Sequence, residues 1–254
     1  MSKLCAFFIA TTFFLLSSAQ ELVQFSMGPS YQYDIYYSFE NGITGYPERS
    51  NWELAFSTDT YDPNIRINSG SGVLLYEVSD NLDDWDNIVS ISNDALQLRN
   101  SNTSWQNGAF VANSTGELNY GWGDYNTFNN SIEGKKIYII NFNSQSKKIR
   151  IDNLINGTFQ FTLANLDGSN EQTISVNASS YSNKKFVYYS LSTMELLDRE
   201  PSSNNWDIVF TKYEADLNND INNPLWYNVT GVLTNSNTTY QYDGFLDINP
   251  EIET

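Results

Sequence analysis

The sequence predicts an all-β protein with little helix. Short apolar runs alternate with polar residues at period two, as expected for strands with one buried face. Asn, Ser, Thr and Gly, which favour turns, separate these runs along the chain. A Trp-containing strand pattern occurs twice, as NWELAF at residues 51–56 and as NWDIVF at residues 205–210. We therefore expect antiparallel sheets with an internal duplication.

The first residues have the features of a secretory signal peptide. Lys3 precedes the apolar run LCAFFIATTFFLL, and the small residues SSA come before Gln20, which predicts a signal peptide over residues 1–19. No segment reaches the roughly 20 apolar residues that a transmembrane helix needs. The only cysteine, Cys5, lies in the predicted signal peptide, so residues 20–254 contain no disulfide and no thiolate ligand. We expect these residues to form a single unit that is secreted, extracellular or associated with the outer-membrane surface.

Charge and histidine content exclude several functions. The chain has 13 Lys and Arg against 30 Asp and Glu, a net charge of −17, which disfavours binding to nucleic acid. It contains no histidine, so a Ser–His triad and a His-ligated zinc site are excluded. The same acidity fits an extracellular protein kept soluble by its charge.

Two related halves, about 30–98 and 180–246, are predicted to flank a β-hairpin region at 99–179. In the first half, a Tyr–Tyr strand begins at Tyr36, the NWELAF strand follows a Pro-containing turn, and GVLLY begins at Gly72. The second half repeats this order from Tyr188, through NWDIVF, to VTGVLTN around Gly231. Between the halves, KKIYIINFNSQSKKIRIDN and GTFQFTLANLDGSNEQTISVN each predict a hairpin. Residues 82–89 have helical spacing, which fits either a helix or an ordered loop.

The repeated Trp strand has a structural and a functional interpretation. Alternation places large apolar side chains on one face, namely Trp52, Leu54 and Phe56 in the first copy and Trp206, Ile208 and Phe210 in the second. This pattern is typical of a core strand. Glu53 and Asp207 are expected on the opposite face, where they cap backbone N–H groups or pair with Arg49 or Arg199. The functional alternative is a carboxylate pair facing a cleft, as in glycosidases.

Two further sets of residues are candidate binding groups. Trp105, Trp122 and Trp226 lie in Gly- and Asn-rich surroundings, where exposed aromatic rings bind ligands but buried rings fill a core. Trp122 lies between two glycines and is the strongest candidate for exposure; Trp226 and Tyr227 are the others. A second set, Asp83, Asp84 and Asp86, offers oxygen ligands for calcium, although the EF-hand pattern is absent and an exposed acidic loop is the alternative.

Nearly the whole chain from about residue 30 to 246 resembles a known family. The stretches YYSLSTMELLDREPSSNNWDIVFTKYE, VTGVLTN, NWELAFSTDTYDPNIRINSGSGVLLYEV, and NYGWGDYN ahead of KKIYIIN are similar to the HmuY-like secreted proteins of Bacteroidetes. Many members of that family are exported by type IX secretion. The resemblance implies an all-β fold at the cell surface or outside the cell, and in its best-known members the capture of haem between paired axial ligands.

The chain departs from the family's haem-binding pattern. Histidine is absent, and Met27 and Met194 are the only methionines after the predicted signal peptide. Methionine can ligate haem iron, which leaves Met194 as a candidate ligand, although a lone methionine more often fills a core. We expect a non-enzymatic binding protein without a cofactor, whose partner is an unidentified extracellular ligand or surface protein. A haem carrier using methionine and a carboxylate-dependent glycan-active protein are the alternatives.

Overall fold

A computed structural model describes residues 23–218 and 223–235. The predicted signal peptide therefore lies outside the described residues, as does the end of the second predicted half. The described residues form sixteen strands and six short 3-10 turns with no α-helix, which confirms the all-β prediction. No helix in this part of the chain has the length and apolar character needed to span a membrane.

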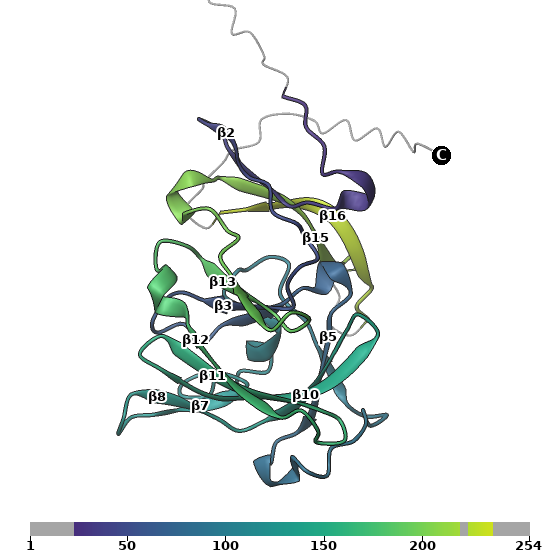
Figure 1. Cartoon of the computed structure of the whole chain (residues 1–254), viewed down its shortest axis with the longest axis vertical. Helices are drawn as coiled ribbons and strands as arrows, with labels where there is room; N and C mark the ends of the chain where they lie inside the picture. The colour runs from purple at the N-terminus through teal and green to yellow at the C-terminus, as the bar shows by residue number, and fades with distance from the viewer. Residues whose placement is uncertain (1–22, 219–222, 236–254) are drawn as a thin grey trace, which may run out of the picture.

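Three antiparallel sheets are stacked as layers (Figure 1). The upper sheet has the order β16 (Trp226–Thr234), β15 (Ile208–Asp216), β1 (Ile35–Ser38) and β2 (Gly42–Gly45). The middle sheet has the order β14 (Glu195–Leu197), β13 (Phe186–Ser190), β3 (Leu54–Ser57) and β4 (Ile65–Ile67).

The lower sheet contains eight strands. Its main path is β12 (Gln172–Asn177), β11 (Thr158–Asn165), β10 (Gln145–Ile155), β9 (Ile137–Phe142), β5 (Leu74–Ser79) and β6 (Leu96–Leu98). Outside this path, β7 (Gly123–Asn126) pairs with β8 (Ser131–Gly134), which pairs with β10. The 3-10 turns are η1 (Pro29–Tyr31), η2 (Ser69–Ser71), η3 (Leu82–Asp84), η4 (Ala109–Val111), η5 (Ala178–Tyr181) and η6 (Ser203–Asn205).

Both predicted hairpins form, as β9–β10 and β11–β12. In the first, Asn143 and Ser144 have φ of 46° and 59°, the left-handed conformation that a tight hairpin turn requires. The helical spacing at 82–89 produces only the single turn η3, whose Asp83 N–H donates to the Asn81 side chain. This segment is therefore a capped loop and not a helix.

The main core lies between the middle and lower sheets. Leu54 and Phe56 of β3 are fully buried there, and the Phe56 ring lies 5.0 Å from that of Phe159 and 5.7 Å from that of Phe161. Each such side chain stabilises the fold by about 1.5–3 kcal/mol when buried. Two smaller clusters of aromatic and aliphatic residues lie above, where the middle sheet faces the upper sheet.

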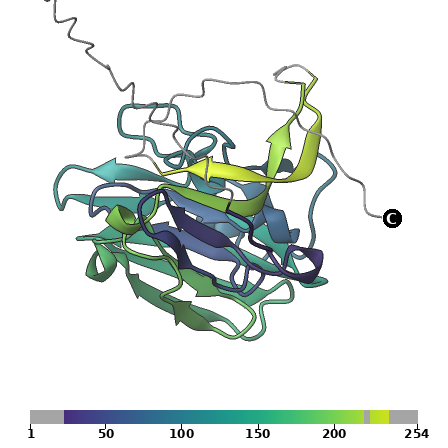
Figure 2. The same ribbon diagram turned by 90° about the horizontal axis from the view of Figure 1, so that it is seen from above.

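The two halves exchange strands, so that each Tyr–Tyr strand pairs with the Trp strand of the other half. In the upper sheet, Tyr36 of β1 is opposite Val209 of β15. In the middle sheet, Tyr188 of β13 is opposite Ala55 of β3, which is the corresponding position of the repeat. Figure 2 shows β16, β15 and β1 side by side from above. The upper and middle sheets thus share one strand order and one register.

Two details of the predicted repeat are wrong. Trp52 packs with Ala55, and not on the face of Leu54 and Phe56 as predicted. Likewise, Trp206 packs with Val209, and not on the face of Ile208 and Phe210. The reason is that regular alternation begins only at Leu54 and Ile208, where β3 and β15 start. In addition, GVLLY belongs to β5 in the lower sheet, and the strand equivalent to β16 is the short β4.

Candidate functional site

The tryptophans of the two repeated motifs pack where the upper and middle sheets meet. The Trp52 ring packs edge-on against Tyr188 at 4.9 Å, and the Trp206 ring packs in the same way against Tyr36 at 5.1 Å. The two tyrosine hydroxyl groups lie 3.4 Å apart, so the equivalent residues of the halves meet. Each edge-on aromatic pair adds about 0.5–1.5 kcal/mol beyond the area it buries.

The acidic residues of the two motifs cap backbone groups, as the structural interpretation predicts. Glu53 Oε2 accepts a hydrogen bond from the Leu191 N–H at 2.6 Å, and its Oε1 accepts one from Ser192 Oγ at 2.7 Å. Asp207 Oδ2 accepts the Phe39 N–H at 2.7 Å. Each carboxylate therefore fixes the turn that follows the Tyr–Tyr strand of the other half.

A cleft of about 670 Å³ opens beside this junction, between strands of the middle and upper sheets. Most of its lining side chains carry hydroxyl or amide groups. The lining residues are Ser57, Thr58, Asp59, Thr60, Asp62, Asn64, Arg66, Ser101, Asn102, Thr103, Ser104, Trp105, Gln106, Ser182, Lys184, Lys185, Phe186, Ser203, Leu233 and Thr234. This volume lies in the range of ordinary small-molecule sites, about 300–1,000 Å³.

Arg66 of β4 is a buried cation in the wall of this cleft. It is 8% exposed, and its guanidinium lies 5.3 Å from the centre of the Trp105 ring. Its hydrogen bonds go to the carbonyl oxygens of Ser101, Ser104 and Trp105 at 2.8–3.1 Å. Among the described residues it forms no ion pair. Burial lowers the pKa of Arg66 to about 10, so it remains charged at neutral pH.

A smaller cavity of about 60 Å³ lies next to the cleft, and the two share Arg66, Trp105, Phe186 and Leu233 in their walls. Trp105 fixes this shared wall, because its Nε1–H donates to the Thr234 carbonyl oxygen at 2.6 Å. The open cleft and the inner cavity therefore adjoin at these four side chains.

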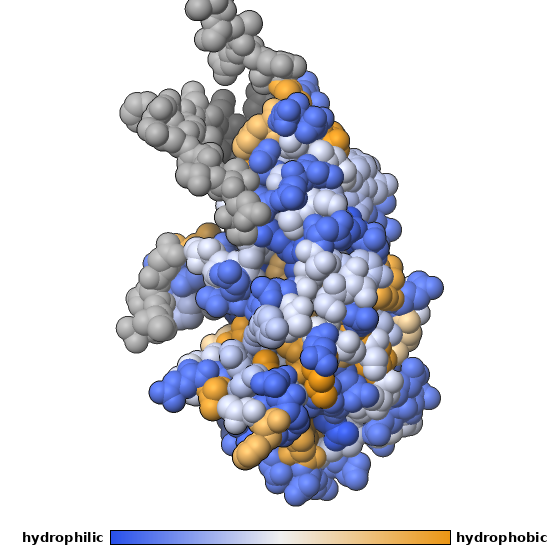
Figure 3. Space-filling view, turned by 90° about the vertical axis from the view of Figure 1, so that its left-hand side faces the viewer, coloured by the Kyte–Doolittle hydropathy of each residue, from blue (hydrophilic) through white to orange (hydrophobic). Residues whose placement is uncertain are grey.

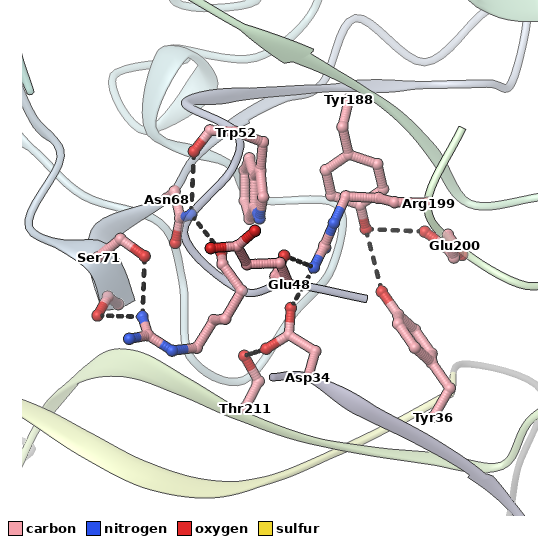
Figure 4. A network of polar contacts seen from close by, with 12 residues as sticks. Asp34, Tyr36, Glu48, Trp52, Asn68, Ser71, Tyr188, Arg199, Glu200 and Thr211 are labelled. Carbon is pink, nitrogen blue, oxygen red and sulfur yellow. Dashed lines mark hydrogen bonds and ion pairs between the residues drawn. The ribbon is translucent and has the colours of Figure 1, made fainter. Parts of the chain in front are cut away.

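The opposite wall of the cavity carries a buried ion pair. Arg199 Nη2 lies 2.7 Å from Asp34 Oδ2, and each side chain is 5% exposed. Thr211 Oγ1 donates to the other Asp34 oxygen at 2.6 Å. Although burial by itself lowers the pKa of Arg199, the Asp34 carboxylate raises it above its usual value. Figure 4 shows Arg199 between the Trp52 and Tyr188 rings, with its guanidinium turned toward Asp34.

Glu200 is a buried acid within the same network. Its Oε1 accepts the Lys185 N–H at 3.0 Å, and its Oε2 accepts the Tyr188 hydroxyl at 2.9 Å. Burial raises the pKa of Glu200 to about 7. Burial, followed by the Glu200 carboxylate, also raises the pKa of Tyr188, which therefore stays protonated and donates.

The structure does not bring the predicted ligand-binding aromatic residues together. Trp122 is fully buried, and its Nε1–H donates to the Pro63 carbonyl oxygen at 2.9 Å. The core interpretation of this ring is therefore confirmed, and its choice as the exposed candidate is wrong. Its flanking glycines let backbone approach closely: a Cβ at Gly121 would lie 2.7 Å, and one at Gly123 2.4 Å, from a neighbouring carbonyl oxygen. Those glycines therefore permit tight packing around the ring and do not uncover it.

Trp226 and Tyr227 begin β16, away from the cleft. The Arg99 guanidinium lies 4.9 Å from the centre of the Trp226 ring, and Tyr227 is 62% exposed. Neither residue lines the cleft or the inner cavity. Met194, the candidate haem ligand, has φ of 59° in the turn between β13 and β14, and its side chain packs against the main core.

The acidic loop at 83–86 follows its structural interpretation. Asp83 and Asp86 are exposed, and Asp84 Oδ2 accepts the Ser79 hydroxyl at 2.7 Å. Within residues 23–218 and 223–235, no three side chains of His, Cys, Asp or Glu are grouped so that they could hold a metal ion. The loop thus offers no metal-binding arrangement in that part of the chain.

Sequence reasoning missed Arg66 and Asp34. It named Arg199 as a partner for the acids of the Trp motifs, whereas Arg199 pairs with Asp34. One signal was present in the sequence, since Arg66 is the single cation between two isoleucines of a short apolar strand. Comparison of the chain with protein-family models, with curated proteins and with solved structures finds no match.

Proposed function

We propose that this chain is a secreted or cell-surface protein that binds an extracellular ligand without converting it chemically. The proposal follows the resemblance to HmuY-like proteins of Bacteroidetes, many of them type IX secretion cargo. The observation that carries it is the cleft of about 670 Å³, whose wall contains the buried Arg66, a cation that forms no ion pair with any described residue. A buried cation without a carboxylate partner costs stability, and such a cost is typical of a site kept for binding.

The surface fits a soluble or surface-attached binding protein. In Figure 3 the hydrophobic residues on one face form small groups among hydrophilic ones. The net charge of −17 keeps such a surface soluble.

The test is a binding screen with a variant that fills the cleft. Residues 20–254 are screened against monosaccharides, amino acids and organic acids by thermal shift. Thr103, an exposed residue of the cleft wall, is changed to Trp, and Phe128, which is 98% exposed on another face of the fold, is changed to Trp as the control. We expect at least one compound class to raise Tm saturably in the wild type and in Phe128→Trp but not in Thr103→Trp. Equal binding by Thr103→Trp would place the ligand elsewhere.

One observation favours a glycan-active protein as the second candidate. Asp59 and Asp62 both line the cleft, and burial raises the pKa of Asp62, which suits a general acid. The lining hydroxyl and amide groups suit sugar hydroxyls equally well. Release of reducing ends from oligosaccharides by the wild type, and its loss in Asp62→Asn, would support this second function over simple binding.

A further inference from the structure

The cleft and the inner cavity share one buried cation, Arg66, in their walls. Arg66 meets carbonyl dipoles but no carboxylate among the described residues. Arg66 is paired with Ala55 of the first Trp motif. The same position of the second motif is Val209, which is paired with Leu233, so Leu233 is the counterpart of Arg66 in the upper sheet. The fold therefore accepts an aliphatic residue at this position, and the arginine is not needed for the strand pairing.

Two donors in the cavity wall have no partner within the described part of the chain. Arg199 Nε and Trp52 Nε1 are both buried and make no hydrogen bond to any described residue. Guanidinium and indole N–H groups can only donate, so whatever satisfies them must be an acceptor. Leaving a buried donor unsatisfied is costly, and such groups in folded proteins mark bound water, a bound ion or a ligand.

The cavity has the size of a compact acceptor group. Its volume of about 60 Å³ is several times the roughly 10–15 Å³ that is needed to hold one water. The charged side chains buried in its wall are Asp34, Arg66 and Arg199. Asp34 pairs with Arg199, so the charge of Arg66 is left without a carboxylate among the described residues. An anionic group satisfies both the free donors and the uncompensated charge, whereas water satisfies only the donors.

We propose that the cleft and cavity recognise a ligand through a compact monovalent anionic group, either a carboxylate or a small free anion. This inference rests on the proposed function and adds the chemical class of the ligand. The anionic group contacts the Arg199 and Trp52 donors and compensates the charge of Arg66, while the rest of a larger ligand extends past Trp105 into the cleft.

The test compares acids with their neutral amides. Formate, acetate and phenylacetate are titrated against formamide, acetamide and phenylacetamide at constant ionic strength, with tryptophan fluorescence and calorimetry as readouts. We expect the acids to bind at least tenfold more tightly than the amides of the same shape. Crystals soaked in sodium bromide report the same site through an anomalous peak between Trp52 Nε1 and Arg199 Nε.

Three variants give the controls. Arg66→Leu installs the residue of the equivalent position and should reduce the preference for acid over amide to less than threefold. Trp52→Phe removes one donor but keeps a ring. Arg99→Leu is the matched control, because Arg99 also stacks on a tryptophan but has Glu214 as a carboxylate partner; its acid preference should equal that of the wild type.

The outcomes separate the two sources of the anion. Tight binding of bromide and formate identifies a free small anion, and affinity that rises steeply from formate to phenylacetate identifies the carboxylate of a larger ligand. Equal binding of acids and amides would overturn this inference but leave the binding function standing. The anion inference would also be overturned if no acid bound, no bromide peak appeared and water alone filled the cavity. The compound screen would then test the binding function independently.

Discussion

Replacing the buried acid Glu200 with glutamine tests the junction of the two sheets. Glu200 is 3% exposed, and burial raises its pKa from 4.5 to about 7. The folded state thus favours the protonated acid. Its stabilising contribution is complete below pH 4.5 and is lost as the pH rises through 7. A pKa increase of this size corresponds to about 3 kcal/mol of unfolding free energy.

Glutamine can keep both hydrogen bonds without titrating. Its Oε1 can accept the Lys185 N–H, and its amide can donate to the Tyr188 hydroxyl, which is free to donate in turn to Tyr36. We therefore expect Glu200→Gln to match the wild type near pH 4.5 and to be more stable by up to about 3 kcal/mol at pH 8.5.

Urea unfolding of both proteins from pH 4.5 to 8.5 measures this difference. All other groups titrate in both proteins. The difference between their unfolding free energies at each pH therefore isolates the contribution of Glu200. A flat difference across the range would refute the argument, since it would mean that Glu200 ionises in the folded protein as it does in the unfolded chain. A variant less stable than the wild type at pH 8.5 would show that the carboxylate is preferred in the folded state.

Three further predictions concern packing and the haem alternative. Trp122→Ala should lower the unfolding free energy by about 3–5 kcal/mol, and Trp226→Ala by much less, in denaturant titrations; similar losses would contradict the burial of Trp122. Gly70→Ala should destabilise more than Gly72→Ala, because a Cβ at Gly70 would lie 1.9 Å from a carbonyl oxygen of β15, whereas one at Gly72 meets open space and costs only the strain of its left-handed φ of 83°. Titration with haemin should give no saturable Soret band that depends on Met194, whose side chain packs against the core; a band lost in Met194→Ala would revive the haem carrier.

The sequence predicted strands correctly where residues close together in the chain determine the structure. The hairpins β9–β10 and β11–β12 were predicted from alternation and turn residues, because both signals are encoded within a few positions of each other. A capping role for Glu53 was one of the predicted alternatives, but its partner, the Leu191 N–H, is distant in sequence and was not predicted.

Long-range pairing was not predictable in the same way. Nothing near Tyr36 or Tyr188 specifies that each pairs with the Trp strand of the other half, because register across such distances depends on the whole packed arrangement. The burial of Trp122 was missed because its glycines permit either exposure or close backbone approach. Arg66 was missed because its one signal, a position between two isoleucines, does not by itself separate a buried cation from one on the exposed face of a strand.

The most direct test of the binding cleft is oxidative footprinting with and without the compound that stabilises the protein most in the screen. Trp105, which is half-buried in the wall of both the cleft and the cavity, should become protected when that compound binds, while the exposed Phe128 keeps its rate of oxidation. Protection of Trp226 and Tyr227 with no change at Trp105 would contradict the account and move the binding site to the start of β16.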